Sequence, residues 1–186
     1  MLYVIDAEGR NLQQITSGSG ANVVPSWSRD GKWIYFASGR TGTNEVWKHS
    51  LETGKEFQIT MHGGFNAFES FDGRTVYFSR FDEAGIWSIP CQGGTESIVI
   101  EGKPQTLYWG QWALTRTGIY FMNVEAEPRA RIDFYEFATR RAHPVLALEK
   151  LPVWAGPSLS ATADGKTIYY AQHDLQSIAM LMEFQP

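Results

Sequence analysis

The sequence contains a single cysteine, Cys91, among its 186 residues. An intramolecular disulfide is therefore impossible, and a zinc site made only of cysteines cannot form. No apolar run reaches the about 18 residues that a membrane-spanning helix needs. The longest apolar stretches, at 33–37 and 178–182, have only the length of a strand. We therefore expect no membrane span in this chain, and no leader either, because Met1 leads directly into a strand-like apolar run.

Concentrated positive charge is also missing. The 16 lysines and arginines are scattered among 20 acidic residues, and the formal net charge is −4. A surface that binds a phosphate backbone carries a patch or run of basic residues. Direct binding of nucleic acid is therefore not expected.

The sequence has little that points to catalysis. No Gly-x-Ser-x-Gly elbow, His-Glu-x-x-His pair or phosphate-binding loop occurs. The four histidines lie in separate parts of the chain and have no metal-ligand spacing among them. We expect no catalytic residue, no bound metal and no cofactor, and hence no enzymatic activity of this chain.

What the sequence does contain is an internal repeat. A segment with Asp-Gly followed by an apolar run begins at Pro25 and returns in outline at Ala67 and Ser160, and a weaker copy at Ala113 has Thr117 in place of the aspartate. The turn glycines of the four copies are Gly31, Gly73, Gly118 and Gly165. Their spacing of about 42–47 residues is typical of four-stranded propeller blades or of helical repeats.

Local chemistry favours strands over helices. Asp-Gly between two apolar runs predicts a β-hairpin, here with a type I′ turn, which needs positive φ at both central residues. Both faces of the segments 33–36 and 167–170 are apolar, as expected for strands that are covered on two sides. Blades stacked against neighbouring blades provide that cover, whereas an open antiparallel sheet leaves one face polar.

We therefore predict an all-β chain, a β-propeller of four-stranded antiparallel blades with about four blades and about 17 strands. Residues 1–186 form one domain or partial propeller, with repeats at about 1–16 (partial), 17–60, 61–100, 101–148 and 149–186 (partial). The N-terminal partial repeat supplies a third and a fourth strand of a blade, and the C-terminal partial repeat supplies a first, a second and a third. Simple ring closure would therefore place two strands at the third position. Either the chain is an open fragment of a larger propeller, which we favour, or it closes as a four-bladed ring with one strand displaced.

An open arc would leave the apolar faces of its end blades without a neighbour. The residues concerned are Leu2, Val4, Ile168 and Tyr170, or those that alternate with them. Exposed apolar patches of several hundred Å² rarely remain unpaired. Self-association through open blade edges is therefore expected.

The repeat resembles that of a known family. Pro25-Ser26-Trp27-Ser28-Arg29-Asp30-Gly31, an apolar strand, Ser38-Gly39-Arg40 and a closing Ile59-Thr60 resemble the repeat of the TolB-like, WD-repeat-like propellers. The tail, 156–184, is similar to the final blade of propellers attached to bacterial winged-helix regulators of the CadC type. Since this chain has no winged-helix sequence, the resemblance implies a sensor or scaffold module and no DNA-reading residue. It implies a periplasmic location if the parent is a membrane-anchored regulator.

Two functions follow as hypotheses. The favoured one is a non-catalytic binding or scaffold module, the sensor or interaction part of a larger bacterial regulator or TolB-like protein. Its partner would be a protein, peptide or small-molecule ligand at the propeller face. The alternative is the gating propeller of a prolyl-oligopeptidase-type serine peptidase whose catalytic domain is not in this chain.

Three tryptophans are the candidate binding residues. Trp109, Trp112 and Trp154 lie near the beginnings of repeat copies, where propellers expose their connections at one face. Exposed aromatic side chains anchor many interfaces. By contrast, Arg40 and Arg80 each follow a second strand, and we expect them to hold the next loop in place.

Overall fold

The computed structural model describes residues 1–17, 20–105, 110–153 and 156–173. These residues form 16 β-strands and no helix, so the predicted all-β class is confirmed. The predicted third strand of the last copy, at 177–181, lies outside the described residues.

The strands form five antiparallel sheets, each built from consecutive strands. The first is a two-stranded sheet of β1 (Tyr3–Val4) and β2 (Gln13–Gln14). Three four-stranded sheets follow: β3 (Asn22–Trp27), β4 (Trp33–Ser38), β5 (Glu45–Ser50) and β6 (Glu56–Gln58); β7 (Phe65–Glu69), β8 (Thr75–Ser79), β9 (Gly85–Pro90) and β10 (Ser97–Glu101); β11 (Trp112–Leu114), β12 (Gly118–Asn123), β13 (Arg131–Glu136) and β14 (Arg141–Ala147). The last sheet pairs β15 (Leu159–Ala161) with β16 (Ile168–Tyr170).

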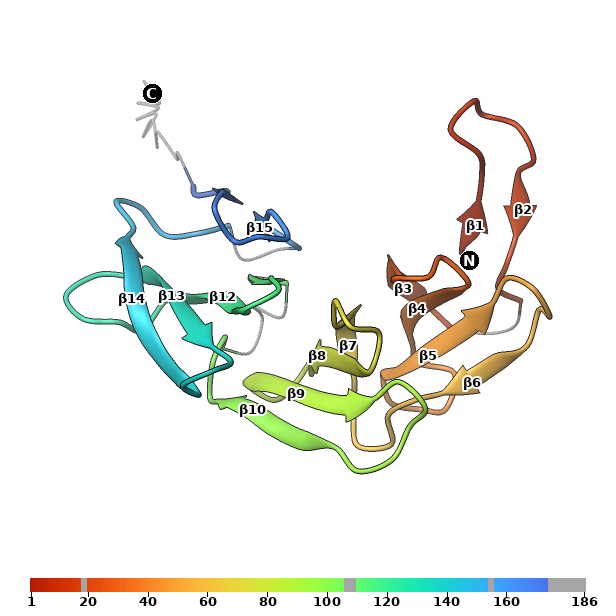
Figure 1. Cartoon of the computed structure of the whole chain (residues 1–186), viewed down its shortest axis with the longest axis horizontal. Coiled ribbons are helices and arrows are strands. Elements are labelled where there is room, and N and C mark those ends of the chain that lie inside the picture. The colour runs from red at the N-terminus through yellow and green to blue at the C-terminus, as the bar shows by residue number, and fades with distance from the viewer. Residues whose placement is uncertain (18–19, 106–109, 154–155, 174–186) are drawn as a thin grey trace, which may run out of the picture.

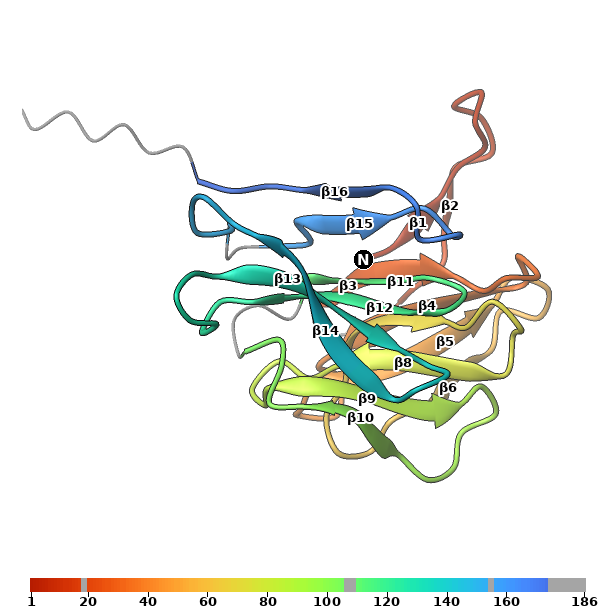
Figure 2. The same cartoon turned by 60° about the vertical axis from the view of Figure 1, so that its left-hand side comes forward.

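Each sheet is one blade, and the blades lie side by side along an arc (Figure 1). Strands β3 and β7 lie on the inner side of the arc, and β6, β10 and β14 lie on its outer side. The inner strands of neighbouring blades contact each other, β3 with β7 and β11 with β15. Figure 2 shows the same blades from the side, stacked as successive layers.

The hydrophobic core consists of three clusters, one between each pair of neighbouring blades from β3 to β16. Strand β8 shows how one strand serves two of them. Val76 and Phe78 point into the cluster shared with the β3–β6 blade, whereas Tyr77 packs on the cluster shared with the β11–β14 blade. Successive side chains of a strand point to opposite faces. The two-sided apolar pattern of the sequence is thus the signature of blade stacking.

The hairpin turns differ from the predicted type. Gly31 has φ +71°, but Asp30 is not among the residues with positive φ, so the type I′ assignment is wrong. The amide of Gly31 donates to the Ser28 carbonyl at 3.1 Å, and the Ser28 amide donates to the Trp33 carbonyl at 2.9 Å. The loop is therefore a type I turn followed by a left-handed glycine.

Side-chain hydrogen bonds explain this choice of turn. The Ser28 hydroxyl donates to Asp30 Oδ1 at 2.7 Å and accepts from the Trp33 amide at 2.9 Å, while the Lys32 amide donates to Asp30 Oδ1 at 3.0 Å. Ser70 with Asp72 and Thr162 with Asp164 repeat the arrangement. The aspartates therefore organise the turns, as proposed from their recurrence.

We predict that these aspartates contribute to stability only when ionised. Hydrogen bonds from Ser28, Ser70 and Thr162 lower the pKa of Asp30, Asp72 and Asp164, respectively. A lowered native pKa stabilises the fold above the unfolded value of about 3.9, and this contribution is lost as the pH falls through the native value. In the triple variant Asp30→Asn, Asp72→Asn, Asp164→Asn, the thermal midpoint should depend less on pH between about pH 5 and pH 2 than it does in the unmodified protein.

The matched control is the triple variant Glu52→Gln, Asp82→Asn, Glu127→Gln, which removes the same charge from three exposed side chains. It should retain the pH dependence of the unmodified protein. Equal curves for the two triple variants would show that the turn carboxylates do not contribute.

Self-association of the isolated chain is a second prediction. Apolar side chains are exposed at both ends of the arc, including Ile5 at 51% beside β1 and Tyr169 at 69% in β16. Sedimentation at micromolar concentration should therefore show dimers or larger species. The variant Ile5→Lys, Tyr169→Lys should shift the distribution toward the monomer. A stable 21.0 kDa monomer of the unmodified chain would contradict this prediction.

Candidate functional site

Four hairpins, each joining the first and second strands of a blade, present one residue at the same repeat position. This position directly follows the serine or threonine whose hydroxyl bonds within the turn, at Ser28, Ser70, Thr115 and Thr162. Its occupants are Arg29, Phe71, Arg116 and Ala163. The hairpin backbones also touch across blades, because the Arg116 amide donates to the Ala163 carbonyl at 2.9 Å. A repeated turn thus brings together residues that are far apart in the sequence.

Beside these hairpins lies a cavity of about 280 Å³, which we call the inner cavity. Its lining comes from four blades: Arg29, Phe68, Phe71, Trp112, Ala113, Leu114, Leu159, Ser160, Ala161 and Ala163. Most of the lining is apolar, and Arg29 supplies its charged group. The inner cavity is therefore a place where segments of four blades can contact a single ligand.

A second cavity of about 300 Å³, the hairpin cavity, lies next to it. It is lined by Ser70, Phe71, Asp72, Thr75, Tyr77, Leu114, Thr115, Arg116 and Phe137. Phe71 and Leu114 line both cavities. The ring of Phe71 therefore lies at the boundary between them.

Two arginines are placed against this ring. The Cζ atom of Arg29 lies 3.8 Å from the ring centroid of Phe71, and that of Arg116 lies 4.8 Å from it. Both distances are within the range of cation–π interactions. Among the residues that the structure describes, neither guanidinium forms an ion pair with a carboxylate. An arginine side chain stays protonated in proteins, so two positive charges lie at this ring, and the charge of the buried Glu69 partly offsets that of Arg29.

The buried carboxylate of Glu69 positions Arg29. Glu69 Oε1 accepts a hydrogen bond from the Arg29 amide at 3.1 Å, and Oε2 accepts one from the Tyr35 hydroxyl at 2.7 Å. Arg29 Nε donates to the Glu69 carbonyl at 3.1 Å. Burial lowers the pKa of Arg29, the charge of Glu69 opposes this effect, and the charge of Arg116 adds to it. The two guanidinium groups are thus close enough to repel each other.

The predicted binding tryptophans have different outcomes. Trp109 and Trp154 lie outside the described residues. The expectation that Trp112 is exposed is wrong: its side chain is 1% exposed and packs edge-on against Phe68, with ring centroids 5.1 Å apart. The physical reason is that β11 is covered by the neighbouring blade. Trp112 lines the inner cavity all the same, so a role in ligand contact stays a prediction.

The sequence interpretation missed Arg29, Phe71 and Arg116. Their signal is an aligned repeat position whose occupant changes from copy to copy while its neighbours recur. The preceding residue is Ser or Thr in all four copies, whereas the position itself is Arg, Phe, Arg and Ala. The hydroxyl residue that builds the turn is thus kept, while the residue that lines the cavities varies. The sequence alignment on Gly118 is wrong in detail, because this glycine is the first residue of β12 and has no positive φ.

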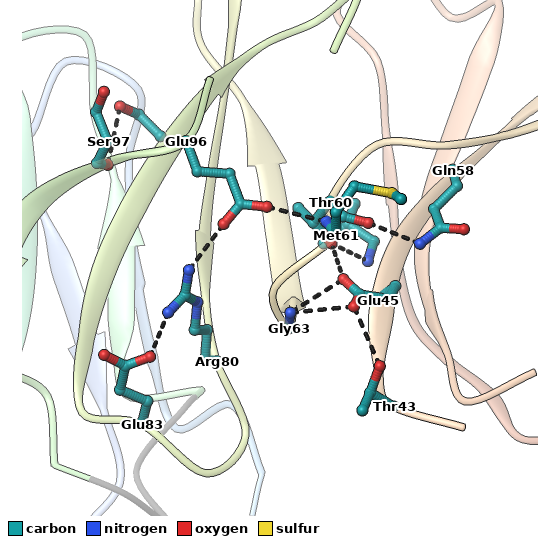
Figure 3. Close-up of polar contacts among 12 residues, drawn as sticks. Thr43, Glu45, Gln58, Thr60, Met61, Gly63, Arg80, Glu83, Glu96 and Ser97 are labelled. Carbon is teal, nitrogen blue, oxygen red and sulfur yellow. Dashed lines mark hydrogen bonds and ion pairs between the residues drawn. The ribbon is translucent and has the colours of Figure 1, made fainter. Parts of the chain in front are cut away.

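Arg40 and Arg80 hold loops, as expected from their positions. Arg80 forms ion pairs with Glu83 and Glu96, and Figure 3 shows this group of side chains. Glu96 also accepts a hydrogen bond from the Met61 amide at 3.0 Å, which ties the β6–β7 connection to the β7–β10 blade. Arg40 pairs with Glu56 and lies 4.6 Å from the ring centroid of Trp47. Arg40 and Arg80 thus form ion pairs with glutamates of this chain, whereas Arg29 and Arg116 form none among the described residues.

Glu45 holds the same connection on both sides of Met61 (Figure 3). This buried carboxylate accepts hydrogen bonds from the Thr60 hydroxyl at 2.6 Å and the Gly63 amide at 3.1 Å. The Thr60 hydroxyl in turn accepts one from the Val46 amide at 2.8 Å. The chain is thereby fixed where it passes from one blade to the next.

Within the described ranges, no three His, Cys, Asp or Glu side chains gather closely enough to hold a metal ion. The same ranges contain no helix with the length and apolar character needed to cross a membrane.

The stacked four-stranded blades define a β-propeller architecture, with the inner cavity at one end of its inner strands. The chain belongs to the family described as the TolB beta propeller domain, whose model matches residues 1–106. This membership confirms the TolB-like resemblance and the predicted fold class.

Individual proteins and solved structures are also similar to this chain. The Tol-Pal system protein TolB of Helicobacter hepaticus is 31% identical over 80 residues, which are 42% of this chain and 19% of that protein. The crystal structure of TolB from Acinetobacter baumannii matches with a TM-score of 0.71 at 19% identity, over 94% of this chain and 43% of the other. A puromycin-hydrolyzing peptidase of Mycobacterium tuberculosis matches with a TM-score of 0.59 at 13% identity, over 77% of this chain and 23% of the other. The chain thus spans less than half of the length of these proteins.

The Arg80 network gives a prediction with a built-in control. Hydrogen bonds to Glu83 and Glu96 raise the pKa of Arg80 in spite of its burial, which acts in the opposite direction. The Glu96 side chain is 8% exposed and that of Glu83 is 55% exposed. Glu96→Gln should lower the free energy of unfolding by about 1–2 kcal/mol, because a charged hydrogen bond is weakened inside the protein.

Glu83→Gln, which breaks an ion pair to the same arginine at the surface, should cost less than about 0.5 kcal/mol. Urea denaturation of both variants measures the difference. Equal losses of unfolding free energy in the two variants would show that the burial of Glu96 does not strengthen its interaction with Arg80.

Proposed function

We propose that the chain is a non-catalytic binding module that holds a protein or peptide partner at the inner cavity and its hairpins. The observation that carries the proposal is the cavity itself, which is lined by four blades and by Arg29, while Arg116 lines the adjoining hairpin cavity and contacts the shared Phe71. Binding sites are mostly apolar hollows with a few converging polar groups. The inner cavity has this composition.

The hydroxyl groups near the cavities support a non-catalytic role. The Ser70 hydroxyl donates to Asp72 Oδ1 at 2.6 Å and accepts from the Thr75 amide at 3.0 Å. The Thr115 hydroxyl donates to the Gly118 carbonyl at 2.9 Å and accepts from the Gly118 amide at 3.1 Å. These hydroxyls hold the turns, and the described lining of the two cavities contains no histidine, the usual base that activates a serine nucleophile.

We further propose that the module is the interaction part of a larger bacterial protein, either TolB-like or a regulator of the CadC type. Family membership and the partial coverage of TolB chains support the first form. The peptidase-gate alternative has a structural neighbour among peptidases, but that likeness, at 13% identity, concerns the fold alone. It is therefore no better supported than the binding module.

Site-specific photo-crosslinking tests where a partner docks. A benzoylphenylalanine at Ser160, an exposed residue that lines the inner cavity, should crosslink a partner in extracts of the source cells. The same group at Ala142, exposed on the outer strand β14, is the matched control and should not. Crosslinking of the same partner from both positions, or from Ala142 alone, would contradict the proposed docking face.

The non-catalytic part of the proposal has its own test. A fluorophosphonate probe should leave all serines of the folded chain unlabelled, because an unactivated hydroxyl reacts slowly with it. The heat-denatured chain serves as the background control. A stoichiometric serine adduct that requires the folded state would refute this part.

A further inference from the structure

We propose that Arg29, Phe71 and Arg116 form a subsite for a carboxylate, which an acidic side chain of a peptide partner supplies next to an apolar residue. This inference rests on the proposed function, since it names the chemistry of the segment that docks at the inner cavity. Both guanidinium groups lie against one aromatic ring, and neither is paired with a carboxylate among the described residues.

The repulsion between the two arginines favours an anion. Burial lowers the pKa of Arg29, the charge of Glu69 opposes this effect, and the smaller contribution of the Arg116 charge lowers the pKa further. A carboxylate bound near both side chains would offset this repulsion and would form charge-assisted hydrogen bonds, which are stronger than neutral ones. Arg40 and Arg80 show the compensated alternative in this chain, because each has its own glutamate.

The acidic groups nearby do not fill this role. Glu69 uses its two oxygens for the Arg29 amide and the Tyr35 hydroxyl. Asp72 lines the hairpin cavity, where its Oδ1 accepts from the Ser70 hydroxyl at 2.6 Å and the Arg74 amide at 3.1 Å. Both carboxylates therefore hold the hairpins and the Tyr35 hydroxyl, and among the described residues neither forms an ion pair with the guanidinium group of Arg29 or Arg116.

The apolar part of the lining favours a carboxylate that stands next to an apolar residue. Phe68, Trp112 and Leu159 give the inner cavity an apolar wall. Its volume of about 280 Å³ lies just below the range of about 300–1,000 Å³ that is typical of ligand pockets. One or two side chains fill such a space, so the preferred segment has a glutamate or aspartate beside an aliphatic or aromatic residue.

Two matched peptides test the inference on the full chain. Acetyl-Gly-Glu-Leu-Glu-Gly-amide and its Gln-for-Glu counterpart have the same length and apolar residue and differ in charge. Titration followed by amide chemical shifts in NMR should show about tenfold tighter binding of the Glu peptide. The advantage should shrink between about 0.05 M and 0.5 M salt, because salt screens exposed charges.

Variants connect this preference to the arginines. Arg116→Gln should abolish most of the preference for the Glu peptide without changing the thermal midpoint, since Arg116 is exposed and its backbone amide holds the contact to Ala163. The matched control is Arg141→Gln, on the outer strand β14, which removes the same charge and should leave the preference intact. Arg29→Lys, which retains the charge, should bind the Glu peptide less tightly than the unmodified chain does.

The outcomes separate this inference from the proposed function. Equal affinity of the two peptides, or no binding of either, would overturn the carboxylate subsite, while crosslinking at Ser160 would still support the docking face. Inorganic phosphate that binds the arginines as tightly as the Glu peptide would also overturn it, since the apolar neighbour would then contribute nothing. A preference that survives Arg116→Gln would place the acidic ligand elsewhere.

Discussion

Each blade of this protein depends on its neighbour for cover of its apolar faces. Val76 and Phe78 face one neighbour and Tyr77 the other, so a blade alone would expose apolar surface on both sides. The free energy of apolar burial, about 25 cal/mol per Å², is gained mainly where blades meet. Polar links such as Glu96 to the Met61 amide then fix how one blade follows the next.

The same constraint creates the candidate site. Stacking places the first-to-second-strand hairpins of successive blades next to one another, and one repeat position of each hairpin reaches the two cavities. The buried Glu69 belongs to one blade and holds Arg29 of the preceding one through its backbone and side chain. Packing and the candidate site are therefore coupled, because the group that joins two blades also places a charged side chain at the inner cavity.

Several elements were readable from the residues alone. The recurrent Asp-Gly pairs marked the hairpins, and the apolar residues on both faces of 33–36 and 167–170 marked stacked strands. The turn type was not readable, because it depends on the Ser28 hydroxyl, which bonds to Asp30 and the Trp33 amide. The burial of Trp112 was not readable either, since it results from contact with Phe68 of another blade.

The sequence by itself determined the strand order, the repeat and the all-β class, because hairpins and alternation are set by residues close together in the chain. Only the tertiary structure decided which arginines form ion pairs with carboxylates. Arg40 and Arg80 meet Glu56 and Glu96 within their own blades. Arg29 and Arg116 instead meet at Phe71 from two other blades, and contacts between segments more than 40 residues apart depend on how the blades stack.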